Sequence, residues 1–173
     1  MLLSRHLLSD RILMEMRTQP LDEEQLEALG PRALQVQQEA ILAEVAEFLE
    51  SRARVGNARR LLTDLVNRER KAGTAVGGGL AIPHVRTMNV KEPTVALLRS
   101  TGGLEFGAPD GEPVHIFLVL VAPPYDDRLY LKIYKEAAEL FLQEHTLEWL
   151  LEATSESEIL QFLRSPEKFV IDW

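Results

Sequence analysis

A nearly unbroken apolar run at residues 114–121 constrains the fold of this 173-residue chain more than any other segment. It reads Val-His-Ile-Phe-Leu-Val-Leu-Val, and half of its residues are β-branched. A strand with one face in water would alternate apolar and polar residues, so this run is typical of a strand covered on both faces. Residues 94–98 form a second run of this kind. The two runs predict a sheet that lies between two layers of helices.

Helical periodicity on both sides of these strands supplies the covering layers. Residues 33–52 repeat apolar side chains at spacings of three and four, and residues 58–71 do the same before the stop signal Gly73. After the strands, the pattern predicts helices at about 128–141, 146–152 and 156–163. The fold class we expect is therefore α/β, a three-layer α/β/α single domain with a small mixed β-sheet.

The first thirty residues fit this pattern less well. Residues 12–16 predict a short first strand, whereas residues 18–30, with prolines at 20 and 31, predict an irregular or briefly helical connection. Glycine-rich segments at 101–103 and 106–111 predict turns. We expect residues 1–33 to form an atypical N-terminal segment that contains the first strand, and residues 34–173 to form the main body. Together they form one compact domain, because no repeat or linker divides the chain.

Composition excludes several classes of function. The net charge of −8 argues against a nucleic-acid binder, whose surface would be basic. The chain has no cysteine, which excludes disulfides, thiolate zinc sites and a cysteine nucleophile. The spacing of its four histidines matches no metal site, so we expect no metal. No apolar stretch approaches the roughly 20 residues of a membrane span, so we expect a cytoplasmic protein without membrane insertion.

A glycine run followed by a histidine is the strongest candidate site. Gly77, Gly78 and Gly79 precede a short apolar strand that ends in Pro83-His84. Glycine lets backbone N–H groups approach an anion, and a neutral imidazole is a nucleophile near pH 7. The pattern predicts that His84 accepts a phosphoryl group whose oxygens the glycine amides hold. On the glycines alone, a turn without function remains open, since neither a P-loop nor a dinucleotide motif is present.

Residues 74–84, preceded by Arg68-Glu69, resemble the active-site segment of fructose/mannitol-type enzyme IIA domains of the bacterial sugar phosphotransferase system. Segments 90–96, 103–114 and 119–123 follow in the order expected for that family. The resemblance covers roughly residues 34–164, and several ordered motifs are more specific than any one of them. It implies that residues 34–173 form an enzyme IIA-like phosphocarrier domain.

The resemblance also implies roles for particular residues. His84 would be the phosphorylated histidine, which receives its phosphoryl group from the phosphocarrier HPr and passes it to an enzyme IIB. Arg68 would hold phosphate oxygens through its forked guanidinium, with Thr74 and Arg86 nearby. Many family members carry a second histidine where this chain has Tyr130, which donates a hydrogen bond but does not titrate near neutral pH. No metal or small-molecule cofactor is implied.

Two other functions remain open at this stage. In the first, the chain is a stand-alone regulatory module of the nitrogen-regulatory type, in which the phosphorylation state of His84 controls a target protein. In the second, it is a degenerate domain that binds an anion without reacting. Of the remaining histidines, His115 lies in a predicted strand and His145 lies between helices, and we expect structural or surface roles for both.

Overall fold

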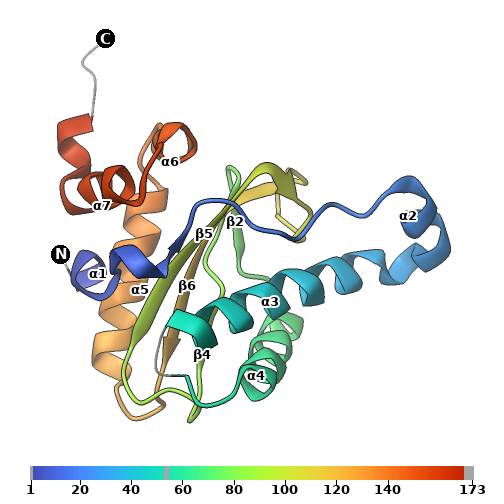
Figure 1. The fold of residues 1–173 in the computed structure, drawn as a ribbon, viewed down its shortest axis with the longest axis horizontal. Helices are drawn as coiled ribbons and strands as arrows, with labels where there is room; N and C mark the ends of the chain where they lie inside the picture. Colours follow the sequence, from blue (N-terminus) through green and yellow to red (C-terminus); the bar gives the residue numbers. More distant parts are fainter. Residues whose placement is uncertain (1, 53–54, 170–173) are drawn as a thin grey trace.

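A six-stranded mixed sheet forms the centre of the protein in a computed structural model, which describes residues 2–52 and 55–169 (Figure 1). The strand order is β1-β5-β6-β3-β2, and β4 pairs with β6 beyond β3. β5 and β6 pair antiparallel, whereas β1, β3 and β4 run parallel to their central partners. The strands are β1 (Ile12–Leu13), β2 (Ala75–Gly77), β3 (Leu80–Ala81), β4 (His84–Arg86), β5 (Thr94–Leu104) and β6 (Val114–Ala122).

Helices cover both faces of this sheet (Figure 1). One face carries α3 (Ala33–Arg52) and α4 (Ala58–Lys71), and the other carries α1 (Leu2–His6), α5 (Asp127–Phe141), α6 (Thr146–Glu152) and α7 (Glu156–Arg164). Short 3-10 turns lie at Ser9–Arg11, Gly30–Arg32 and Pro166–Phe169. The three-layer α/β/α architecture predicted from the sequence is confirmed. Within the described ranges, no helix is both long and apolar enough to cross a bilayer.

Strand β6 divides the core into two apolar clusters. Because successive side chains of a strand point to opposite faces, Ile116, Leu118 and Leu120 pack in the α5–α7 cluster. Phe117 and Val119 pack in the α3–α4 cluster. All five side chains are buried, which is the physical meaning of the unbroken apolar run. The prediction that this strand is covered on both faces is therefore confirmed.

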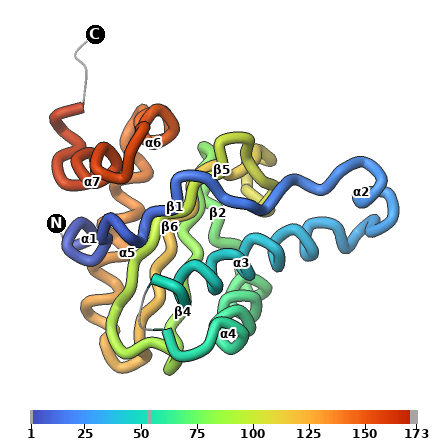
Figure 2. Tube along the Cα trace, viewed as in Figure 1, coloured from blue at the N-terminus to red at the C-terminus, as the bar shows by residue number. Residues whose placement is uncertain are grey.

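The N-terminal segment joins the same domain. β1 adds to the far edge of the sheet beside β5, and α1 lies against α5, whose Glu136 carboxylate accepts hydrogen bonds from two N-terminal amides (Figure 2). The strand is shorter than the predicted 12–16. The Met14 carbonyl accepts a hydrogen bond from the Arg99 side chain at 2.8 Å, and the Met16 N–H donates to the Arg99 carbonyl at 2.7 Å outside the assigned strand.

The connection at residues 18–30 contains one short helix, α2 (Glu23–Leu29), in agreement with the prediction of a briefly helical segment. Asp22 and Gln25 form a reciprocal capping box at its start. α2 and the first turns of α3 extend away from the sheet as an arm (Figure 1). The arm therefore lies outside the body of the domain that carries His84.

Strand β5 is longer than expected. The segment 101–103, predicted as a turn, continues the strand to Leu104 with a shift of register between Arg99 and Leu104. Gly103 has a φ of +78°, and a Cβ at this position would lie 2.8 Å from the His115 ring. Glycine is required here because the bulge needs a left-handed backbone and brings the chain against an imidazole. The glycines at 102 and 103 correctly predicted irregular backbone, but the prediction that the strand ends there was wrong.

Replacement of Phe117 tests the β6 core directly. The ring is fully buried and meets Phe106 edge to face, with a centroid distance of 5.2 Å. We expect Phe117→Ala to lower the free energy of unfolding by about 3–5 kcal/mol, because it leaves a cavity in the α3–α4 cluster. Leu142→Ala is the control, since Leu142 is 84% exposed and should change stability by less than about 0.5 kcal/mol. Urea denaturation of both variants measures the difference, and equal losses would contradict this description of the core.

Candidate active site

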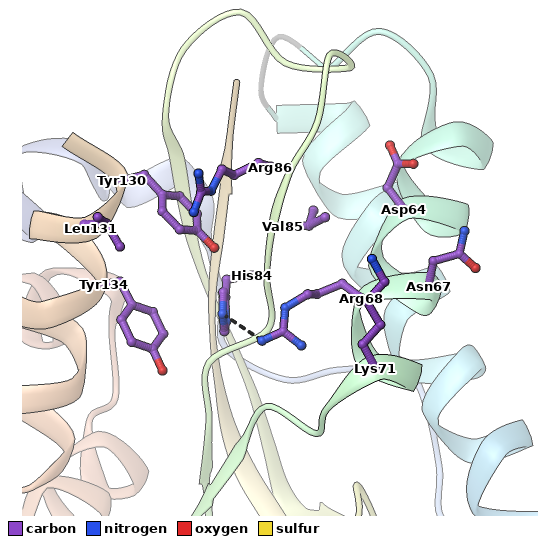
Figure 3. Close-up of a pocket in the computed structure, with 10 residues that line it drawn as sticks. All are labelled: Asp64, Asn67, Arg68, Lys71, His84, Val85, Arg86, Tyr130, Leu131 and Tyr134. Carbon is purple, nitrogen blue, oxygen red and sulfur yellow. Dashed lines mark hydrogen bonds between the residues drawn. The ribbon is translucent and has the colours of Figure 1, made fainter. Parts of the chain in front are cut away.

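His84 lies where the two helical layers approach each other at an edge of the sheet. It begins β4, which pairs with β6 at this edge, in register with Leu120. Side chains from α4, β4 and α5 enclose a cavity of about 690 Å³ beside the imidazole (Figure 3). The lining residues are Asp64, Asn67, Arg68, Lys71, His84, Val85, Arg86, Tyr130, Leu131 and Tyr134.

The two ring nitrogens of His84 have different partners. Nδ1 lies 2.6 Å from the carbonyl oxygen of Ile82, which only accepts hydrogen bonds, so Nδ1 carries the proton in the neutral ring. Nε2 lies 3.1 Å from Nη2 of Arg68, and a guanidinium only donates. The two contacts select the same tautomer. They leave the lone pair on Nε2, where Arg68 and the cavity meet.

The pKa of His84 lies below its ordinary value of 6.5, chiefly because burial disfavours the charged ring. The positive charges of Arg68 and Arg86 lower it further, against the opposing effect of the Ile82 hydrogen bond. The ring is therefore neutral at neutral pH and available as a nucleophile. Because the pKa of His84 is lower in the folded than in the unfolded protein, the neutral ring contributes its full stabilisation of the fold at pH values above the unfolded-state pKa. That stability is lost as the pH falls through the folded pKa.

Cationic side chains give the cavity the charge that suits a phosphoryl group. Arg68 is fixed by a second hydrogen bond, from Nη1 to the Ala72 carbonyl at 2.8 Å, and Lys71 lines the same cavity. Arg86 stacks over the Tyr130 ring at 4.9 Å and forms an ion pair with Asp127. A guanidinium with a free edge binds phosphate oxygens in a forked geometry. The arrangement can therefore accept an anion next to Nε2.

Two tyrosines of α5 form the opposite wall. The Tyr130 and Tyr134 ring centroids lie 6.1 and 4.7 Å from that of His84 (Figure 3). Tyr130 is buried, and this burial raises the pKa of its phenol despite the nearby charges of Arg86 and Arg68. The phenol thus keeps its proton and is a hydrogen-bond donor at neutral pH. The sequence prediction that Tyr130 lies near His84 agrees with this placement.

The structure does not bring Gly77, Gly78 and Gly79 to His84, and this corrects the sequence-based picture. They form the turn between β2 and β3, with φ values of 91°, 62° and 78°. Leu80 pairs with Ile116 and His84 with Leu120, so the turn is displaced by four residues along the strand direction, roughly 13 Å. The Gly78 N–H donates to the Asp110 carboxylate at 2.8 Å. The Gly78 amide does bind an anion, but it is this carboxylate.

Thr74 also lies outside the cavity lining, where it binds the buried carboxylate of Glu69. Sequence analysis missed Tyr134 and five further lining residues, which are Asp64, Asn67, Lys71, Val85 and Leu131. Helical spacing carries the signal for three of the six. Asp64 and Lys71 lie four residues before and three after Arg68, and Tyr134 lies four residues after Tyr130, so each shares a helix face with a predicted site residue.

The other two histidines considered above lie elsewhere. His115 is half-buried in β6, and its Nδ1 is 3.2 and 3.1 Å from the carbonyl oxygens of Ser100 and Thr101. His145 is exposed at the start of α6 and pairs with Glu148. Neither lines the cavity beside His84. Their placement agrees with structural and surface roles.

Comparison with known proteins shows the family. The family described as "Phosphoenolpyruvate-dependent sugar phosphotransferase system, EIIA 2" matches residues 32–165. The fructose-specific EIIA component of Haloferax volcanii is 34% identical over 110 residues, which span 64% of this chain and 71% of that protein. The chain therefore belongs to the EIIA 2 family of the sugar phosphotransferase system.

Two further relatives differ in how much of their length is shared. The fructose-specific EIIABC component of Bacillus subtilis is 27% identical over 132 residues, which are 76% of this chain but only 21% of that protein. The crystal structure of the nitrogen regulatory protein IIA-Ntr from Neisseria meningitidis superposes with a TM-score of 0.76 at 25% identity. That match covers 94% of this chain and 99% of the other. Relatives thus include both a sugar-transport component and a regulatory protein.

Removal of the Arg68 charge tests the electrostatics of the site. We expect Arg68→Gln to raise the pKa of His84 towards its ordinary value, because one of the cations that oppose protonation is lost. Arg70→Gln is the matched control, since Arg70 lies two residues away on the same helix but is bound to Glu39, 2.9 Å away. An NMR titration of the imidazole gives both values. An unchanged pKa in Arg68→Gln would show that the guanidinium does not act on His84.

Proposed function

We propose that this protein is a phosphohistidine carrier that accepts a phosphoryl group on Nε2 of His84 and passes it to a second protein. One observation carries the proposal. His84 has an acceptor-only partner on Nδ1 and a donor-only partner on Nε2, so the neutral ring presents its lone pair to a cationic cavity. Membership of the EIIA 2 family gives this chemistry its context.

The transfer step follows from this geometry. The Nε2 lone pair attacks the phosphorus of a phosphohistidine on the donor protein, forming a new N–P bond as the donor's N–P bond breaks. The bonding pair stays on the departing imidazole nitrogen of the donor. The His84 ring gains positive charge in this step, and the Ile82 carbonyl stabilises that charge through the Nδ1 proton. Discharge to the next protein is the same step in reverse, with a new acceptor nucleophile.

Arg68 changes partner during the reaction. In the unphosphorylated protein, Nη2 of Arg68 is hydrogen-bonded to Nε2 of His84. An incoming phosphoryl group replaces this contact, and the phosphoryl oxygens become the acceptors for the guanidinium. Lys71 and Arg86 line the same cavity and add positive charge around those oxygens. Phosphoryl transfer requires mainly alignment and charge neutralisation, which these side chains supply.

Exposed apolar side chains on and after the site elements support docking of protein partners. Met88 follows β4 and is 76% exposed. Leu131 lies on the cavity wall and is 54% exposed. A carrier must bind donor and acceptor in turn, so its interface is expected to be small and transient. A charged cavity with an exposed leucine on its wall suits such an interface.

An HPr-type phosphocarrier and an enzyme IIB are the partners we propose. The Bacillus subtilis relative is an EIIABC component, in which the IIA region shares a chain with B and C components. A regulatory role is the second candidate, because the match to the IIA-Ntr structure extends over nearly the whole length of both chains. In that role, the phosphorylated and free forms of His84 would differ in affinity for a target protein.

The first test is phosphorylation of His84. The protein is incubated with labelled phosphoenolpyruvate, enzyme I and HPr, and acid-labile label is measured. We expect incorporation into the wild type and into His145→Gln, whose imidazole is exposed and remote from the cavity, but none into His84→Gln. Passage of the label to an enzyme IIB supports sugar transport. Retention of the label on His84 with phosphorylation-dependent target binding supports regulation. A wild type without label would contradict the carrier proposal and favour simple anion binding.

The second test concerns the phenol of Tyr130. Tyr130→Phe keeps the buried ring and the Arg86 contact but removes the O–H donor. We expect the rate of phosphoryl transfer to fall about fivefold, because a hydrogen bond contributes about 1 kcal/mol. Tyr125→Phe is the control, since its hydroxyl donates to the Lys91 carbonyl outside the cavity. Equal rates in the two variants would exclude the Tyr130 hydroxyl from the reaction.

A further inference from the structure

Glu69 is a buried carboxylate next to the site, and the mechanism above does not use it. It follows Arg68 in the last turn of α4 and is 7% exposed. Burial of a carboxylate costs free energy unless hydrogen bonds satisfy it. Here Oε1 accepts the backbone N–H of Thr74 at 2.8 Å, and Oε2 accepts the Thr74 hydroxyl at 2.6 Å. Both oxygens therefore hold one residue of the loop between α4 and β2.

That loop connects Glu69 to both nitrogens of the imidazole. The Thr74 carbonyl accepts the Ile82 N–H at 3.0 Å, and the Ile82 carbonyl in turn accepts the Nδ1 proton of His84. Two residues before Thr74, the Ala72 carbonyl accepts Nη1 of Arg68, whose Nη2 lies on Nε2. One carboxylate thus fixes the loop that holds both partners of the imidazole, the Ile82 carbonyl at Nδ1 and the Arg68 guanidinium at Nε2.

We propose that Glu69 is a positioning residue for the His84 reaction, acting through Thr74 to set the imidazole tautomer and the direction of Arg68. This proposal rests on the carrier function for its consequence in catalysis, but its structural part concerns the unphosphorylated ring. Loss of the carboxylate frees the Ala72–Thr74 segment. Ile82 and Arg68 then lose their fixed partners, and the ring is no longer confined to one tautomer.

The chain offers a matched control for a variant that removes the Glu69 carboxylate. Glu44 on α3 is 6% exposed, and its carboxylate accepts the backbone N–H and hydroxyl of Thr18 at 2.7 and 2.6 Å. It is as buried as Glu69 and likewise binds a threonine, with an additional hydrogen bond from the Arg17 N–H at 2.8 Å, but it lies outside the His84 cavity. A merely structural carboxylate should therefore behave as Glu44 does. Glu69→Gln retains a side chain of the same shape that can hydrogen-bond to both groups of Thr74.

The first measurement is ¹⁵N NMR of the His84 imidazole in the full-length unphosphorylated chain. We expect wild type, Glu69→Gln and Glu44→Ala to show the Nδ1-protonated tautomer. Glu69→Ala should show a mixture of tautomers. Should Glu69→Ala fold poorly, Thr74→Val with Thr74→Ser as its control tests the same link. A His84 spectrum unchanged in both Glu69→Ala and Thr74→Val would overturn the proposal.

The second measurement is the rate of phosphoryl transfer from HPr. We expect Glu69→Ala to lower kcat by about tenfold or more with little change in KM, since misplacement of reacting groups by about 1 Å can cost about 10²-fold. Rates that fall equally in Glu69→Ala and Glu44→Ala would show that Glu69 serves stability alone and would overturn the proposal. A wild type that does not accept phosphate refutes the carrier function, while the NMR result still decides the positioning of His84.

Discussion

The hydrogen bond between Nδ1 of His84 and the Ile82 carbonyl is the interaction on which the site depends. It is short, at 2.6 Å, and it joins two residues of the same chain segment on either side of Pro83. A histidine side chain that is free to rotate would populate both tautomers and more than one ring orientation. With Nδ1 bound to a backbone acceptor, Nε2 directs its lone pair towards the cavity, 3.1 Å from the guanidinium of Arg68.

The position of β4 explains how two layers contribute to one site. An edge strand leaves its outer side unpaired, so α4 and α5 can both reach the residues it carries. Arg68 reaches His84 from α4 on one side, and the tyrosines reach it from α5 on the other side, as Figure 3 shows. A histidine in the middle of this sheet would be covered by neighbouring strands and by one helical layer. The cavity beside His84 thus lies at a position where the fold is open on one side.

Much of this could be predicted from the sequence, and the exceptions have physical causes. The buried strand at 114–121 and the helices at 33–52 and 58–71 follow from local periodicity, and the structure agrees with them. The sequence did not reveal that the glycine turn lies away from His84, because the partner of Gly78, Asp110, is thirty-two residues away and pairing across such a distance leaves no local pattern. Tyr134 was missed for a different reason. A tyrosine on an amphipathic helix has the same sequence signature whether it packs against a leucine or against an imidazole.

The division of the core into two clusters has a consequence for the motions of the protein. Each helical layer is held to the sheet by its own set of buried side chains. The His84 cavity needs both layers in place. Its lifetime is therefore set by the layer that opens more often, and hydrogen exchange in α4 and α5 would report directly on how long a competent site persists.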